Sequence, residues 1–170
     1  MVQLYHTQSG LCYDAWVATP SSIVLRVPAT LRYRDVAVRT VTAACHLIGC
    51  ADGDAKQRDA TSLDLQRDFD AQFISAFSEI FNNIAIHAYE RSGEGDVTLT
   101  LMPGADHLEL ELRDEGKPFD IGTVQAPKLE SLPEGGMGLH IARACLDTLD
   151  YQAGPPNIWR LSKHLATEEK

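Results

Sequence analysis

The sequence predicts an α+β fold, a two-layer α/β sandwich in which helices cover a mixed β-sheet. Residues 30–49 and 63–91 carry apolar side chains at intervals of three and four residues, which is typical of amphipathic helices. Residues 97–112 instead alternate apolar and polar side chains, which is typical of half-buried strands. A strand pair interspersed among helices, without strict strand–helix alternation, favours the α+β class.

The N-terminal part of the chain contains one predicted strand and the first predicted helix. Residues 23–28 form a β-branched run that ends at a proline, and we expect a strand there. The helix of residues 30–49 follows it. The polar and charged segment 51–62 is expected to be a solvated loop.

The middle of the chain contains the second helix and a hairpin. The helix lies within residues 63–91 and has a wide, aromatic-rich apolar face. The alternating strands 97–101 and 108–112 are separated by Pro-Gly-Ala-Asp, so we expect them to pair as a hairpin.

The C-terminal third begins with the glycine- and proline-bearing segment 114–138. Residues 138–149 are predicted to form a helix, and residues 158–165 a closing strand, with another strand left open around Tyr151. The pattern divides the chain into an extension or edge element (1–22), one domain (23–165) and a tail (166–170).

The composition fits one acidic domain. Of the 170 residues, 44% are hydrophobic and 23% are charged, so the chain can bury a core. It has 15 Lys and Arg residues against 24 Asp and Glu residues, a net charge of −9. That charge disfavours non-specific nucleic-acid binding, which needs clustered cations, and suits a basic protein partner better.

The sequence also carries expectations about location. No charge-free run reaches the ~18 residues that span a bilayer, and the N-terminus lacks the pattern of a signal peptide. The four cysteines show no metal-binding spacing, so we expect reduced thiols in a cytoplasmic protein without a membrane contact.

Three segments carry residue types suited to chemistry, and the first lies on the second predicted helix. Glu79, Asn83 and His87 follow each other at intervals of four residues, which places them on nearly one line of an α-helix. A carboxylate and an amide oxygen on one line can share the shell of a Mg²⁺ ion. The alternative is a solvated polar stripe opposite an apolar face.

The second segment, residues 114–120, directly follows the second strand of the hairpin and reads Asp-Glu-Gly-Lys-Pro-Phe-Asp. Asp114 can accept a hydrogen bond from a ligand amino group, and Gly116 can let a flat base approach the backbone. The alternative is an ordinary turn at a strand end.

The third segment, residues 135–139, reads Gly-Gly-Met-Gly-Leu and opens a predicted helix. Glycines before a helix let backbone N–H groups converge on a phosphate. The segment matches neither a Walker A loop nor a Rossmann fingerprint. The alternative is a plain helix entry.

In this order and spacing, the three segments resemble the N, G1 and G2 boxes of the GHKL ATPase superfamily, and more finely the anti-sigma-factor serine/threonine protein kinases. Those kinases carry E-x-x-x-N-x-x-x-H-A-Y, D-x-G-x-P-F-D and G-G-x-G-L at the corresponding places. Asn157, Ser162 and Lys163 match their closing strand. The resemblance covers about residues 23–165 and implies a Bergerat-type ATP-binding fold, the histidine-kinase-like ATPase domain.

The resemblance implies a role for each matching residue. Asn83 would ligate the Mg²⁺ that bridges the phosphates, and Glu79 would be the catalytic base. Asp114 would bind the adenine amino group. Residues 121–134 would form a lid over ATP. The other implied cofactor-binding residues are His87, Gly116, Gly136, Gly138 and Leu139, with Gly116 facing the base and Gly136 and Gly138 contacting phosphate.

The implied function is that of an ATP- and Mg²⁺-dependent serine-protein kinase, which acts as an anti-sigma factor in a partner-switching pathway. It would phosphorylate a small antagonist protein (an anti-anti-sigma protein) and bind a sigma factor, and proteins of this type commonly work as a homodimer. A non-catalytic ATP-binding anti-sigma or regulatory binding module is the alternative. The two differ at Glu79, which a kinase needs and a binding module does not.

Overall fold

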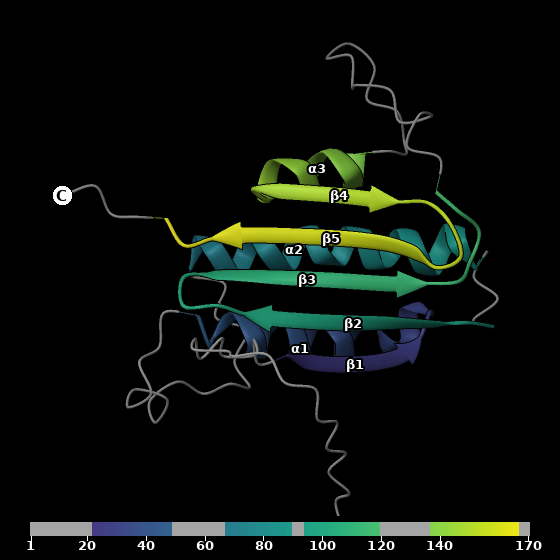
Figure 1. The fold of residues 1–170 in the computed structure, drawn as a ribbon, viewed down its shortest axis with the longest axis horizontal. Helices are drawn as coiled ribbons and strands as arrows, with labels where there is room; N and C mark the ends of the chain where they lie inside the picture. Colours follow the sequence, from purple (N-terminus) through teal and green to yellow (C-terminus); the bar gives the residue numbers. More distant parts are fainter. Residues whose placement is uncertain (1–21, 49–66, 90–93, 120–136, 167–170) are drawn as a thin grey trace, which may run out of the picture.

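The computed structural model describes residues 22–48, 67–89, 94–119 and 137–166 (Figure 1). Within these ranges the succession of strands and helices is the predicted one, and the strand left open around Tyr151 is present as β4. The elements in chain order are β1 (Ile23–Pro28), η1 (Leu31–Tyr33), α1 (Arg34–Cys45), α2 (Asp68–Asn83), η2 (Ile84–Ala88), β2 (Asp96–Pro103), β3 (His107–Asp114), α3 (Met137–Cys145), β4 (Thr148–Gln152) and β5 (Asn157–His164).

The strands form one five-stranded sheet in the order β1-β2-β3-β5-β4. The predicted α+β class is confirmed, and the helices lie together on one face of the sheet (Figure 1). The prediction of a mixed sheet is wrong, because all four strand pairings are antiparallel. The reason is the last strand: β5 inserts between β3 and β4, and so separates the two strands that α3 connects.

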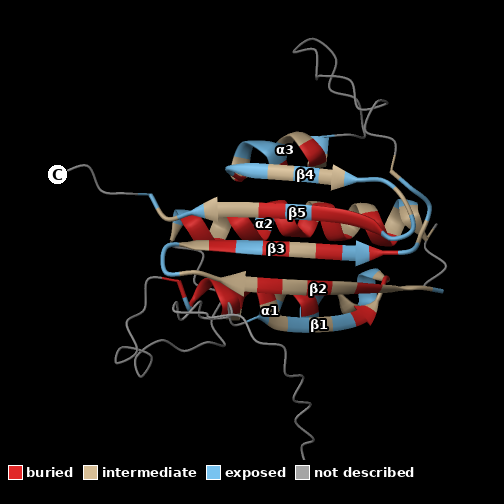
Figure 2. Cartoon of the chain, in the orientation of Figure 1, coloured by how far each residue is buried: buried red, intermediate tan, exposed pale blue. Residues whose placement is uncertain are grey.

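The core lies between the sheet and the helices. Side chains of β2 and β3 alternate between buried and less buried positions, as their sequence pattern predicts (Figure 2). α2 contributes stacked and tilted aromatic rings to the same core, with the Phe77 and Phe81 centroids 5.8 Å apart. Trp159 of β5 is also buried there. The two layers therefore share one hydrophobic interior.

The last helix is shorter than predicted. α3 ends at Cys145, and the predicted end at Leu149 is wrong. Leu149 instead lies in β4, paired with Leu161 of β5. The backbone N–H of Asp147 donates to the Ser162 carbonyl 3.0 Å away. This pairing with β5 ends the helix before Leu149.

The predicted helix of residues 63–91 is divided in the structure. The described part begins as α2 at Asp68 and changes at Ile84 into the π-helical turn η2. Three predicted segments lie outside the described residues: the extension 1–22, the loop 51–62 and the tail 166–170. Ser22 and Ala166 are the exceptions. No helix in the described ranges is long and apolar enough to cross a bilayer.

Candidate active site

α2 places Glu79 and Asn83 on its outward side. Most of this helix is buried, so its accessible positions fall on one line that also includes Gln72 and Ser75. Glu79 and Asn83 are both half-buried on that line, one helical turn apart. The structure therefore presents them together, as the spacing predicts.

His87 lies one turn further along, in η2, where the π-helical hydrogen bonds join residues five apart. Its side chain is exposed. That His87 shares the line of Glu79 and Asn83 stays a prediction.

Asp114 is the last residue of β3, and it is only 3% exposed. Its Oδ1 accepts hydrogen bonds from the backbone N–H of Gly116, at 2.9 Å, and from Asn157 Nδ2, at 3.0 Å. Burial raises the pKa of the Asp114 carboxyl, and these two donors act in the opposite direction. Both hydrogen bonds that the carboxyl accepts from described residues end on Oδ1, and none of these residues donates to Oδ2.

Asn157 is the residue whose importance the sequence did not reveal. It is 1% exposed, and Nδ2 also donates to the Gly116 carbonyl at 2.9 Å. Its Oδ1 accepts from the backbone N–H of Gly154 and from the Tyr151 hydroxyl. The amide thus uses both donors and both lone pairs. The sequence matched Asn157 to the closing strand of the kinases, but that match assigned no role to it.

Aromatic rings support this network from the side. The Tyr151 and Trp159 ring centroids lie 4.3 Å apart, and those of Phe119 and Trp159 lie 5.6 Å apart. The Tyr151 hydroxyl accepts a 2.7 Å hydrogen bond from the backbone N–H of Phe119. Through Tyr151, the backbone after Asp114 is therefore tied to β4 and β5.

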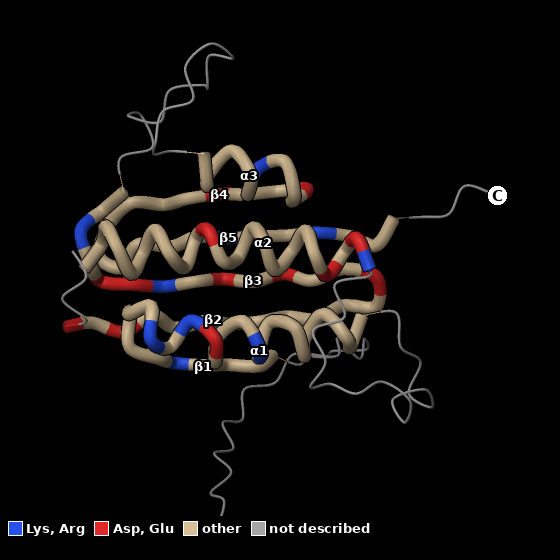
Figure 3. The backbone as a smooth tube through the Cα atoms, turned by 180° about the vertical axis from the view of Figure 1, so that it is seen from behind, with Lys and Arg blue, Asp and Glu red and all other residues tan. Residues whose placement is uncertain are grey.

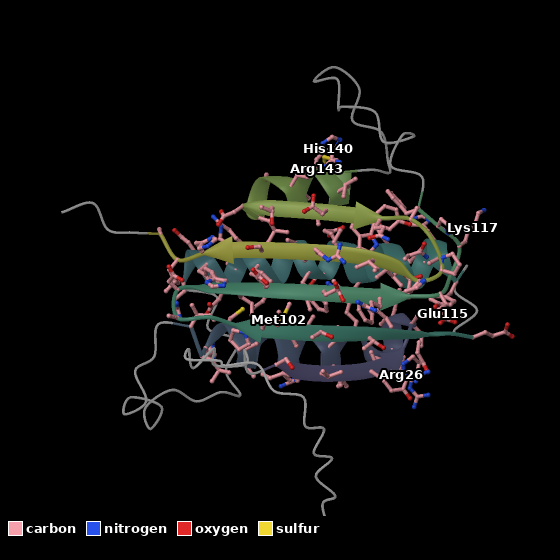
Figure 4. The ribbon with its side chains drawn as sticks, viewed as in Figure 1. Arg26, Met102, Glu115, Lys117, His140 and Arg143 are labelled. Atoms are coloured by element: carbon pink, nitrogen blue, oxygen red, sulfur yellow. The ribbon has the colours of Figure 1, made fainter. Side chains whose placement is uncertain are left out.

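The segment after β3 is also held against η2. The backbone N–H of Lys117 donates to the Ala88 carbonyl at 2.9 Å, and the Tyr89 hydroxyl accepts from the backbone N–H of Glu115, also at 2.9 Å. A Cβ on Gly116 would lie 2.7 Å from the Ala88 oxygen, so only glycine permits this approach. Glu115 and Lys117 mark this end of the sheet in Figure 4.

The first turn of α3 lies against the Glu79 carboxylate. A Cβ on Gly138 would overlap Glu79 Oε2 and lie 3.2 Å from its Cδ atom. The structure thus brings the segment around Gly138 against the segment that contains Glu79. The segment after Asp114 meets the same helix further along, at η2. Leu139 points into the core, which leaves only its backbone to face a ligand. Gly136 and the lid predicted at 121–134 lie outside the described residues.

The residues present fit a magnesium nucleotide. Asn82, next to Asn83, has a buried Oδ1 atom that bonds to no group in the described part of the chain. An amide oxygen is a ligand that Mg²⁺ accepts, and a buried oxygen left unpaired calls for a partner. Asp114 Oδ2 accepts no hydrogen bond from a described residue and fits an amino group, and the missing side chain of Gly138 leaves backbone accessible beside Glu79.

A groove of about 610 Å³ also borders Asp114, on the other side of the sheet. Its walls include Arg26, Thr98 and Arg113. These residues project from β1, β2 and β3 on the face of the sheet opposite the helices. None of Glu79, Asn83 or Gly138 lines it, so it is separate from the place where α2 and α3 meet.

We predict that Asn157→Ala destabilises the protein by about 1–3 kcal/mol, because Gly154, Tyr151 and Asp114 would each lose a buried hydrogen-bond partner. Urea unfolding monitored by circular dichroism measures the loss. Ser162→Ala, on the same strand, is the control and should change stability by less than about 0.5 kcal/mol. Equal stability of both variants would show that the network contributes nothing.

Comparison with known proteins agrees with this arrangement. Residues 27–163 match the model of the histidine kinase-like ATPase domain. The serine-protein kinase RsbW of Oceanobacillus iheyensis is 28% identical over 102 residues, 55% of this chain and 65% of that protein. The matched stretch thus spans just under two thirds of that relative's length. RsbW of Halalkalibacterium halodurans is 24% identical over 161 residues, 90% of this chain and 89% of that protein.

Among solved structures, the RsbU and RsbW domains of a Mycobacterium tuberculosis protein superpose with a TM-score of 0.50 at 15% identity. The match covers 85% of this chain and 32% of that one, and it shows the shared fold. Because the family match extends over most of the described strands and helices, the chain belongs to the histidine kinase-like ATPase domain family.

Proposed function

We propose that this protein is an ATP-dependent serine-protein kinase that acts as an anti-sigma factor and phosphorylates a small antagonist protein. The observation that carries the proposal is the contact between Glu79 and the first turn of α3 at Gly138. It puts a carboxylate beside a glycine-opened helix start, where a base is needed next to a phosphate. The names of the RsbW relatives support the proposal.

Within the proposal, each residue does a separate task. Asp114 Oδ2 accepts a hydrogen bond from the adenine amino group, while Asn157 and Gly116 hold Oδ1 in place. The amide oxygens of Asn83 and Asn82 would hold the magnesium ion. When bound, Mg-ATP supplies the phosphoryl group and the charge that offsets its oxygens.

Glu79 acts on the acceptor. The serine oxygen of the antagonist bonds to the γ-phosphorus as the bond to the bridging oxygen breaks and ADP leaves. Glu79 takes the serine proton, which makes the oxygen a better nucleophile. Its half-buried position beside α3 supports this role. A non-catalytic binding module is the alternative, because nucleotide binding alone does not need Glu79.

Asp114→Asn tests the adenine contact. The amide can turn a donor toward the adenine amino group, and a charge-assisted hydrogen bond of about 1.5–3 kcal/mol is lost. We expect calorimetry to show an affinity for Mg-ATP at least roughly tenfold weaker. Asp150→Asn, on an exposed position of β4, is the matched control. Unchanged affinity in the Asp114 variant would contradict the adenine role.

Asp114→Asn should also change how stability depends on pH in the absence of nucleotide. Because burial raises the pKa of Asp114, the native state binds this proton more tightly than the unfolded state. The protonated Asp114 carboxyl therefore stabilises the folded state below its pKa in the unfolded chain. This contribution is lost as the pH rises from that value through the higher pKa of the folded state. Over this pH range, the free energy of unfolding of wild type should fall relative to that of Asp114→Asn.

Glu79→Gln tests the base. We expect nucleotide affinity to stay near that of wild type and phosphoserine formation to fall by about 10²-fold or more. The assay combines labelled ATP with the small antagonist proteins encoded near this gene. Asp68→Asn, at the exposed start of α2, controls for loss of a helix carboxylate. Absence of phosphoserine with wild type and every antagonist would favour the binding module.

Gly138→Ala tests whether Gly138 acts through Glu79. The added methyl group should displace the Glu79 carboxylate and lower the rate, at least roughly tenfold, while the protein stays folded. In the Glu79→Gln background the same change should have little further effect, since the displaced group is no longer a base. A double-mutant cycle measures this. Fully additive losses would assign Gly138 a separate role.

A further inference from the structure

α3 carries an apolar stripe on its outward side. Met137 is 46% exposed and Ile141 is 41% exposed, and the two are one helical turn apart. Leu139 and Ala142 of the same helix are buried in the core. Figure 2 shows that α3 is buried on one side and exposed on the other. Large apolar side chains occur on both sides, and burial in this domain accounts for only one of them.

The stripe begins beside the candidate active site. Met137 is the neighbour of Gly138, which contacts Glu79. A protein serine that receives a phosphoryl group must come within about 3–3.5 Å of the phosphorus. Any protein that brings a serine to Glu79 therefore approaches the first turn of α3.

A cation on the same helix indicates the chemistry of the partner at this place. Arg143 is exposed, and it is the sole Lys or Arg of residues 137–152. Figure 4 shows Arg143 and His140 projecting from α3, and Figure 3 shows the basic position on the helix. Although the net charge of −9 suits a basic partner for the chain as a whole, Arg143 favours a carboxylate on the part of the partner that meets α3.

We propose that Met137, Ile141 and Arg143 form a docking surface for the antagonist protein, a claim that rests on the proposed kinase function. An apolar patch of the antagonist packs on Met137 and Ile141, and an acidic side chain beside that patch pairs with Arg143. Docking there holds the acceptor serine at Glu79. The antagonist is the occupant because its acceptor serine has to reach Glu79, beside this turn of the helix.

Another exposed apolar residue provides a matched control. Val36 is 48% exposed on α1, and α1 lies at the opposite edge of the molecule from α3 (Figure 1). Truncation of either side chain removes a similar exposed apolar group from a helix. If the docking surface is specific, only the change on α3 affects the use of the antagonist.

The test measures the initial rate of phosphoserine formation against antagonist concentration at saturating Mg-ATP, with an antagonist that wild type phosphorylates. We expect Ile141→Ala combined with Arg143→Glu to raise the KM for the antagonist at least about fivefold, the scale for loss of well-packed interface contacts. The kcat and the affinity for Mg-ATP should stay within about twofold of wild type. Val36→Ala should leave all three unchanged.

A second measurement separates the charge from the apolar contact. Raising the salt concentration should raise the KM of wild type and have a smaller effect on Arg143→Glu, because screening removes an attraction that the variant lacks. Circular dichroism checks that each variant is folded.

The outcomes are distinct. An unchanged KM in the double variant, with phosphorylation intact, overturns the docking surface and leaves the kinase function standing. A weaker affinity for Mg-ATP in the double variant also overturns it, by placing these side chains in the nucleotide site. If wild type phosphorylates no antagonist, the proposed function fails, and the docking surface fails with it.

Discussion

Asn157 Nδ2 lies 3.0 Å from Asp114 Oδ1 where β3 and β5 run side by side, and the candidate site is built outward from this buried bond. A carboxylate this deeply buried costs free energy unless donors satisfy it. Asn157 and Gly116 supply them on one oxygen, and no described residue donates a hydrogen bond to the other. The same amide holds Gly154, so the loops at this end of the sheet share one anchor.

α2 has to satisfy two demands at once. Its aromatic inner side fills the core, and this burial leaves only a narrow outward line of accessible positions. Glu79 and Asn83 occupy that line, and the turn into η2 then brings Ala88 against Gly116. The π-helical turn places the backbone of η2 where the segment after β3 can bond to it.

Much of the site was accessible from the sequence, because its motifs are short and lie on single elements. Glu79 and Asn83 were found from helical spacing, and Asp114 from its place after an alternating strand. Asn157 was matched only as part of the closing strand, without a role, and Asn82 was not singled out. The role of Asn157 depends on burial and on partners far away in the sequence, and a local pattern shows neither. Nothing in the local pattern marks the change from α to π geometry at Ile84 either.

The kind and order of the helices and strands follow from local sequence patterns, since periods of 2 and 3.6 residues are local properties of the backbone. The order of strands in the sheet does not follow from them. β5 pairs with β3 and β4, and this pairing made the sheet antiparallel, ended α3 before Leu149 and put Asn157 opposite Asp114, 43 residues away. These features arise in the folded chain, because strand order depends on which distant surfaces pack together, and no local pattern encodes that choice.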